Sequence, residues 1–148
     1  MFMIETKIFD AVNRPSSIEK KEVVNFLFEH LQEYGDSKKD IEKAIHYSVK
    51  EFVSFGGFTL LIIENNEIVG VTVINKTGMG GYIPENILVY IATHQDYRGK
   101  GLGKTLMQKA IEMVKGDIAL HVEADNPAKI LYEKMGFTNP YLEMRLKK

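Results

Sequence analysis

A glycine-rich stretch, YRGKGLG, lies between an apolar segment and an amphipathic one, and it constrains this chain more than any other feature. The apolar run before it, from Ile87 to Ala92, predicts a buried strand. In the segment after it, apolar residues recur at the spacing of one helical face, at Leu102, Leu106, Ala110, Ile111 and Val114. A glycine in a first helical turn costs about 1 kcal/mol relative to alanine, so folding alone does not explain these glycines. The stretch therefore predicts a strand-to-helix junction that serves a ligand.

The start of a helix favours an anionic ligand. Its first N–H groups have no acceptor within the helix, and the helix dipole places partial positive charge there. Glycines let phosphate oxygens approach these N–H groups closely. Arg98, Lys100 and Lys104 add positive charge around the same stretch. We therefore expect a phosphate-bearing ligand at residues 98–104.

Three phosphate-binding patterns compete for this stretch. The dinucleotide fingerprint G-x-G-x-x-G fails in both possible registers. The nucleotide-binding pattern G-x-x-x-x-G-K-[ST] ends correctly at Thr105 but requires a glycine where Arg98 stands. The pattern [RQ]-x-x-G-x-[GA] is met by Arg98, Gly101 and Gly103. This third pattern is the pyrophosphate loop of the GNAT family of N-acetyltransferases, which the stretch resembles.

Composition sets the outer limits of the prediction. The 148 residues are 45% hydrophobic and 26% charged, which favours a single domain spanning residues 1–148. The formal net charge of −1 argues against nucleic-acid binding through a basic surface. The chain has no cysteine, and its four histidines do not follow metal-ligand spacing, so we expect no metal site. Without a signal-like start or a long apolar run, the sequence predicts a cytoplasmic protein that does not bind membranes.

The remaining segments alternate between strand and helix signals. Capping residues introduce three helices: Ser16 with Glu19, then Ser37 or Asp40, and later Asn126-Pro127. Asn65-Asn66 predicts a hairpin turn. The expected strands are 2–9, 58–64, 67–75, 87–92, 118–122 and 142–146. Four helices are expected: the first begins after Ser16, the second runs from its cap through Phe52, the third spans 101–115, and the fourth begins at Asn126-Pro127 and ends at Met135. The resulting order, β-α-α-β-β-β-α-β-α-β, is an α/β domain with a mixed sheet and is the order of the GNAT family.

A second motif supports the same resemblance. The segment NPAKILYEKMGF, from Asn126 to Phe137, is similar to the family pattern N-x-x-A-x-x-L-Y-x-K-x-G-F. It departs from that pattern in one respect, because Ala128 lies one residue nearer to Asn126. The two motifs occur in the expected order, so the resemblance extends over the whole chain.

The resemblance implies transfer of an acetyl group from acetyl-coenzyme A to an amine, by direct attack in a ternary complex. Backbone N–H groups would hold the pyrophosphate, with Arg98 nearby; the residues concerned are Gly99, Lys100, Gly101, Leu102, Gly103 and Lys104. The pantetheine arm would lie along the backbone of Ile91, Ala92 and Thr93, where the central strands of the family splay apart. Asn126 either contacts the cofactor as well or only caps its helix.

The resemblance also implies catalytic roles. Tyr132 is the candidate general acid for the thiolate leaving group, and aromatic packing is the alternative role for this residue. Glu85 is the first choice for the base that deprotonates the amine. Glu123, His121 and His94 are alternatives, and an ordered water chain is another.

The acceptor is a small-molecule or peptide amine, and nothing in the sequence chooses between them. A homodimer is plausible in this family. Two other functions compete with catalysis: a non-catalytic acyl-coenzyme A sensor with the same fold, and a nucleotide-binding protein using Gly103-Lys104-Thr105. Turnover with any amine favours the enzyme over the sensor, and preference for ATP over coenzyme A favours the nucleotide-binding protein.

Overall fold

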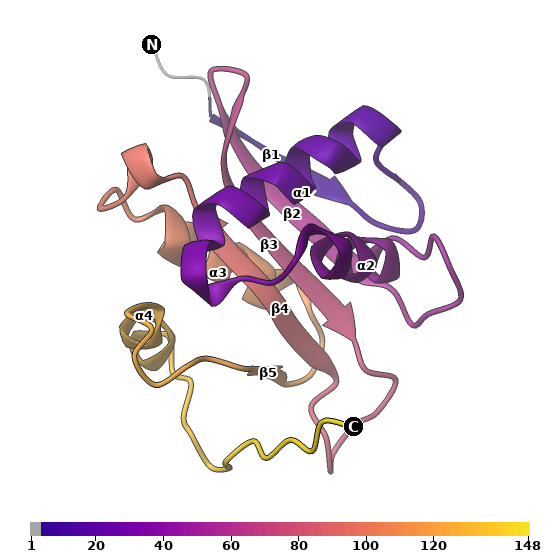
Figure 1. The fold of residues 1–148 in the computed structure, drawn as a ribbon, viewed down its shortest axis with the longest axis vertical. Helices are drawn as coiled ribbons and strands as arrows, with labels where there is room; N and C mark the ends of the chain where they lie inside the picture. Colours follow the sequence, from indigo (N-terminus) through magenta and orange to yellow (C-terminus); the bar gives the residue numbers. More distant parts are fainter. Residues whose placement is uncertain (1–3) are drawn as a thin grey trace.

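The computed structural model describes residues 4–148 and is built on a five-stranded mixed sheet (Figure 1). Its strands are β1 (Ile4–Phe9), β2 (Gly57–Glu64), β3 (Glu67–Lys76), β4 (Asn86–Thr93) and β5 (Ile118–Leu120), and they lie side by side in sequence order. The first four strands pair antiparallel, whereas β5 pairs parallel to β4. The predicted hairpin is confirmed, because Asn65 and Asn66 both adopt the positive φ that a tight two-residue turn requires.

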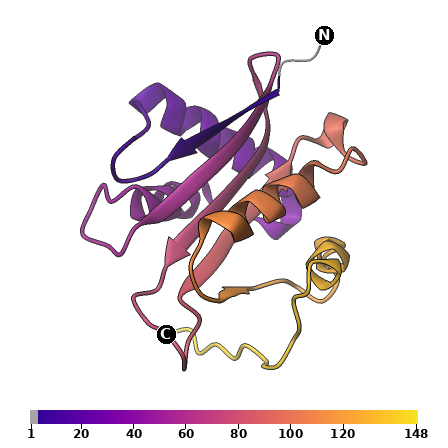
Figure 2. The same cartoon turned by 180° about the vertical axis from the view of Figure 1, so that it is seen from behind.

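Helices cover both faces of this sheet (Figures 1 and 2). On one face lie α1 (Ser17–Leu31), the short helix η1 (Gln32–Tyr34) and α2 (Lys38–Ser48). On the other lie α3 (Leu102–Met113) and α4 (Ala128–Lys134), and the short helix η2 (Gln95–Tyr97) links β4 to α3. Each face has its own buried apolar cluster, one including Leu27 and Ile45 and the other including Leu106 and Met107. No helix within residues 4–148 is long and apolar enough to cross a membrane.

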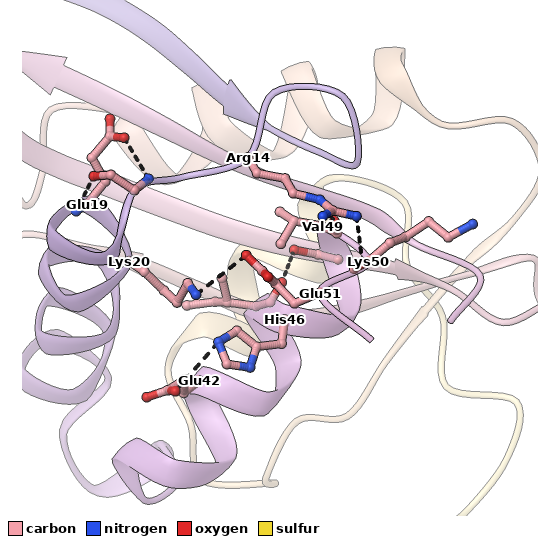
Figure 3. Close-up of polar contacts among 11 residues, drawn as sticks. Arg14, Glu19, Lys20, Glu42, His46, Val49, Lys50 and Glu51 are labelled. Carbon is pink, nitrogen blue, oxygen red and sulfur yellow. Dashed lines mark hydrogen bonds and ion pairs between the residues drawn. The ribbon is translucent and has the colours of Figure 1, made fainter. Parts of the chain in front are cut away.

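Polar contacts fix the two helices of the first face to each other. The Ser16–Glu19 capping box is present, and Ser37 rather than Asp40 caps α2. Figure 3 shows the Arg14 guanidinium donating hydrogen bonds to the carbonyl of Val49 (2.9 Å), the C-cap of α2, and to that of Lys50 (2.7 Å), the next residue. These carbonyls lie near the negative end of the helix dipole, which favours a nearby cation. The segment that leads into α1 is therefore joined to the end of α2.

The C-terminal segment differs from the prediction. Residues 138–148 form no strand, although we expected one at 142–146. The apolar side chains of this segment are almost fully exposed, with Leu142 at 86%, Met144 at 92% and Leu146 at 84%. The neighbouring edge strand β5 has only three residues, so it offers little backbone with which a further strand could pair.

Several predicted boundaries also shift. The helix expected at 101–115 spans Leu102–Met113, and the strand expected at 118–122 ends at Leu120. The second helix ends at Ser48, so Phe52 lies outside it and is 42% exposed. The first strand is confirmed from Ile4 onward, and the start of the expected range 2–9 lies outside the described residues.

Candidate active site

A bulge in β4 lies where the sheet opens between β4 and the edge strand β5. In the pairing with β3, Val73 faces Tyr90 and Ile74 faces Leu88, so Val89 is an extra residue on β4. A bulge of this kind bends its strand and increases the local twist. Pairing with β5 covers only Asn86–Leu88 and stops where the bulge begins. The splayed central strands expected from the resemblance are therefore present, and β4 continues to Thr93 without β5 beside it.

The strand register determines which backbone groups face this split. The His94 N–H donates to the Val69 carbonyl (2.8 Å), and hydrogen-bonded pairs alternate along an antiparallel ladder. Ala92 therefore directs its backbone polar groups toward β3, whereas Ile91 and Thr93 direct theirs toward the split. Of the three residues predicted to bind the pantetheine arm, Ile91 and Thr93 present suitable backbone groups, and those of Ala92 pair with β3.

The glycine loop lies at the end of β4 where the split is open. Gly99 (φ 81°) and Gly101 (φ 76°) both have left-handed backbone, and a Cβ atom on either would meet no atom within 4 Å. Gly101 is the N-cap of α3 and, being glycine, supplies no side-chain cap to the first N–H groups of that helix. The loop thus combines open space with donors that have no acceptor within the helix. These features fit a pyrophosphate group.

The third glycine has a packing role that the motif does not reveal. A Cβ atom on Gly103 would lie 3.2 Å from Leu131 Cδ2, which is tighter than ordinary van der Waals contact. Gly103 therefore lets α3 approach α4 closely. Arg98 is held on the opposite side of the loop, because its guanidinium donates to the His30 carbonyl at the end of α1 (3.2 Å).

Tyr132 lies beneath the split, on the face covered by α3 and α4. Its side chain is 7% exposed and belongs to the same apolar cluster as Leu106, with Ile91 packed against that cluster. The Phe137 ring lies edge-on to it, with the centroids 6.1 Å apart. Burial raises the pKa of Tyr132 to about 12, so the phenol stays protonated at neutral pH. This position shows the packing role of Tyr132, and its role as a proton donor stays a prediction.

Asn126 lies one residue before the N-cap of α4, which is Pro127 and supplies no side-chain cap. The Asn126 Oδ1 accepts a hydrogen bond from the Ala128 N–H (2.9 Å), and its carbonyl accepts from the Lys129 N–H (3.1 Å), so the residue stabilises the turn that leads into α4. The sequence placed the cap at Asn126, one residue too early, and contact of Asn126 with the cofactor stays a prediction.

The candidate bases lie at two different ends of the paired segment. Glu85 precedes β4, and its Oε1 accepts a hydrogen bond from the Asp117 N–H (3.3 Å) in the turn before β5. His121 directly follows β5, and Leu120 is paired with Leu88, so His121 lies level with the start of the split. Glu85 thus lies where the strands are joined, whereas His121 lies where they part.

His121 and Glu123 belong to the opposite face from Tyr132. Leu120 and Val122 pack against the cluster on the α3 face, and side chains alternate along extended backbone. His121 and Glu123 are therefore directed to the α1 face, and both are exposed. The split separates a buried phenol on one face from accessible polar groups on the other.

Comparison with known families supports the same assignment. A family model described as an acetyltransferase (GNAT) domain matches residues 56–139, more than half of the chain. This chain belongs to the GNAT acetyltransferase family. Acetyl-coenzyme A is the co-substrate that the family implies, and the matched region includes both β4 and the glycine loop.

Curated relatives match the GNAT domain over part of their length. The bS18-alanine N-acetyltransferase of Haemophilus influenzae is 37% identical over 82 residues, which cover 53% of each chain. N-alpha-acetyltransferase 30 of Schizosaccharomyces pombe is 26% identical over 85 residues, covering 54% of this chain and 57% of the relative. The chain spans about half the length of these curated relatives.

Solved structures share the GNAT fold over nearly the whole chain. The ribosomal-protein-S18-alanine N-acetyltransferase of Escherichia coli superposes with a TM-score of 0.66 at 17% identity, covering 95% of this chain and 80% of the other. PH1933 of Pyrococcus horikoshii gives a TM-score of 0.69 at 21% identity, covering 95% and 93% of the two chains. At these identities the likeness shows the fold alone.

Two contacts of the GNAT domain near the split escape sequence reasoning. The Tyr34 hydroxyl donates to the Asp125 carbonyl (3.3 Å), which joins η1 to the loop after β5. The Tyr90 hydroxyl donates to Asp36 Oδ2 (2.6 Å), and burial together with that carboxylate raises the pKa of Tyr90. Both hydrogen bonds join residues more than 50 positions apart in the chain, so no local sequence pattern predicts them.

Proposed function

We propose that this protein transfers the acetyl group of acetyl-coenzyme A to an amine by direct attack in a ternary complex. The observation that carries the proposal is the split between β4 and β5, which opens at the same end of β4 as the glycine loop. The split joins the face that holds Tyr132 to the face that holds His121. We propose that the cofactor enters from the first face and the amine from the second.

The cofactor is held mainly by backbone groups in this proposal. The first N–H groups of α3 and the open space beside Gly99 and Gly101 accommodate the pyrophosphate. The N–H and C=O groups of Ile91 and Thr93 bind the pantetheine arm as an added strand would. A backbone N–H at the split can also stabilise negative charge on the thioester oxygen.

Tyr132 is proposed to stabilise the departing thiolate. An ordinary thiol has a pKa of about 8.5, whereas burial raises the pKa of Tyr132 to about 12. Complete proton transfer from the phenol to a thiolate is therefore uphill by about 5 kcal/mol, at 1.36 kcal/mol per pKa unit. A hydrogen bond from the phenol avoids this cost, and the proton itself can come from the ammonium group formed when the amine attacks.

His121 is the base that the geometry favours over Glu85. An amine with a pKa near 10.4 is mostly protonated at neutral pH and must lose a proton before attack. Histidine side chains accept protons near neutrality, and His121 is exposed beside the split. Glu85 already accepts a backbone hydrogen bond at the joined end of the strands.

The names of the curated relatives favour one class of acceptor. One relative is named for alanine acetylation on ribosomal protein bS18 and the other for N-alpha-acetylation. We propose that a peptide amine, such as the α-amino group at a protein N-terminus, is the preferred acceptor. A non-catalytic acyl-coenzyme A sensor is the alternative function, and it predicts binding without turnover.

Binding tests the cofactor assignment first. We expect coenzyme A and acetyl-coenzyme A to raise the melting temperature of the purified protein, because a ligand that binds only the folded state stabilises it. Differential scanning fluorimetry with ATP and NAD at equal concentrations provides the control. An equal shift with ATP would show that the loop does not select coenzyme A.

Two substitutions test the choice of base. His121→Gln should lower kcat/KM for a peptide amine by about 10-fold, because general base catalysis typically contributes 10²–10⁴-fold and water can replace part of it. The pH profile of kcat/KM should also lose its acid limb. Glu85→Gln is the matched control and should leave that profile unchanged. If only Glu85→Gln changes the pH profile, Glu85 is the base, as the sequence suggested. If neither substitution changes it, a water molecule or a backbone group accepts the proton from the amine.

A further inference from the structure

Two histidine rings in contact join the end of α1 to the segment that leads into the glycine loop. His30 lies in the last turn of α1 and is 5% exposed. Its ring centroid is 4.3 Å from that of His94, which follows β4, and 4.5 Å from that of Phe26. Neither the phosphate-binding motifs of the sequence nor the candidate catalytic bases include His30, so its burial here has no role so far.

Each ring accepts a hydrogen bond from a backbone N–H group in the segment after β4. His30 Nδ1 accepts from the Gln95 N–H (3.3 Å), and His94 Nδ1 accepts from the Asp96 N–H (3.1 Å). An acceptor nitrogen carries no proton, so the hydrogen bond from Gln95 requires a neutral His30 ring. Protonation of His30 Nδ1 would break this bond to the backbone.

The same contacts hold the start of the glycine loop. Gln95 and Asp96 begin η2, and the chain then reaches Gly99 within three residues. The His30 carbonyl accepts from the Arg98 guanidinium (3.2 Å), so α1 contacts both ends of the segment 95–98. His94 Nε2 also lies 3.3 Å from Glu67 Oε1, which ties this segment to β3.

We propose that His30 is a positioning residue for the glycine loop, and that protonation of His30 releases the loop and weakens cofactor binding. The inference rests on the proposed function, since it assumes that the loop binds coenzyme A. His30 acts through Gln95 and Arg98, and it does not touch the cofactor itself.

The surrounding charges support a response on the acid side of neutrality. Burial lowers the pKa of His30, and the charges of His94 and Arg98 lower it further, whereas Glu29 and Asp96 oppose the change. When the loop is released the ring is solvated, and its pKa returns toward about 6.5. The state in which His30 holds the loop therefore binds fewer protons than the released state. Its free-energy advantage over the released state is complete above about pH 6.5 and is lost as the pH falls below that value.

Two variants separate the hydrogen bond from the titration. His30→Asn keeps an acceptor, because the asparagine Oδ1 can replace Nδ1, but this side chain does not titrate. His30→Leu fills the space without an acceptor. At about pH 8 we expect His30→Leu to weaken coenzyme A binding about five-fold, as for one lost hydrogen bond, and His30→Asn to bind nearly as wild type does. Maximal kcat at saturating acetyl-coenzyme A should stay the same in both.

The pH dependence gives the decisive comparison. Between about pH 8 and pH 5.5, coenzyme A affinity measured by calorimetry should fall more in wild type than in His30→Asn. Protonation of the cofactor's own phosphates affects both proteins equally, so the difference reports on the histidine. His46→Asn, which removes a histidine of α2 paired with Glu42, is the control and should behave as wild type does. Equal pH dependence in wild type and His30→Asn would overturn the proposal.

A measurement without cofactor separates this proposal from the proposed function. Followed by NMR over the same pH range, the backbone amide signals of residues 95–101 should shift together with the His30 ring in wild type, and should not do so in His30→Asn. Loop signals that ignore the His30 titration would contradict the positioning role, even if His30→Leu fails to fold. If those signals shift as expected while coenzyme A binds to no variant, the proposed function is wrong and the structural link between His30 and the loop stands.

Discussion

Gly101→Val is expected to weaken coenzyme A binding by at least about 100-fold. The branched side chain would project into the open space where the pyrophosphate would approach the first N–H groups of α3. A hydrogen bond to a charged group is worth about 1.5–3 kcal/mol, so losing two costs about 3–6 kcal/mol. Each 1.4 kcal/mol corresponds to a factor of about ten in affinity. Isothermal titration calorimetry on the folded variant measures the loss.

Gly81→Val is the matched control for this substitution. Gly81 (φ 79°) has nearly the same backbone conformation as Gly101 (φ 76°), and a Cβ atom there also meets no atom within 4 Å. Both variants therefore carry a similar strain, about 1–2 kcal/mol for a side chain in left-handed backbone. Gly81 lies in the loop that precedes β4, whereas Gly101 lies in the loop that follows it. Equal losses of affinity in the two variants would mean that strain, and not the glycine loop, explains the effect.

Tyr132→Phe should lower kcat by about 10-fold or more, with coenzyme A affinity nearly unchanged. The substitution keeps the ring, so its contact with Phe137 and its place in the apolar cluster survive. Only the hydroxyl that would stabilise the thiolate is lost, and a hydrogen bond to a charged group is worth about 1.5–3 kcal/mol, which is about 10-fold or more in rate. The lower expected value allows water to replace part of this contribution. Pre-steady-state kinetics separates the chemical step from product release.

Tyr47→Phe provides the comparison, since the Tyr47 hydroxyl donates to the Lys76 carbonyl (2.6 Å) away from the split. This variant should lose stability without losing kcat.

The pH dependence of wild type gives a second check on Tyr132. Because burial raises the pKa of Tyr132 to about 12, wild-type kcat should show no loss from this residue between pH 8 and 10. The same shift should make the fold less stable as the pH rises from about 10 to 12, where unfolded tyrosine ionises first. An unchanged kcat in Tyr132→Phe would return this residue to a packing role.

Local patterns were sufficient to predict most of the fold. The capping box at Ser16 and the turn at Asn65-Asn66 depend on neighbouring residues alone, and both are present. The split beside the glycine loop followed from the family resemblance, and it too is present. The resemblance covered the loop and the segment from Asn126 to Phe137, which together identify the family.

Features that depend on distant partners could not be predicted in this way. The bulge at Val89 is visible only in the register between β3 and β4, yet it determines which backbone groups face the split. The sequence places Glu85 directly before the central strand, and only the parallel register shows that this is the joined end of β4 and β5. The expected C-terminal strand failed because alternation of Leu142, Met144 and Leu146 says nothing about whether a partner strand is available.

Acetyl transfer itself is the most direct test of the central claim. The purified protein should be mixed with acetyl-coenzyme A and a peptide that has a free N-terminal amine, and free thiol and acetylated peptide should be followed together. We predict that both products appear in equal amounts, that a peptide with a blocked amine gives neither, and that Gly101→Val abolishes both at moderate cofactor concentration. Tight binding of acetyl-coenzyme A without product from peptide or small-molecule amines would contradict the claim and identify the protein as an acyl-coenzyme A sensor.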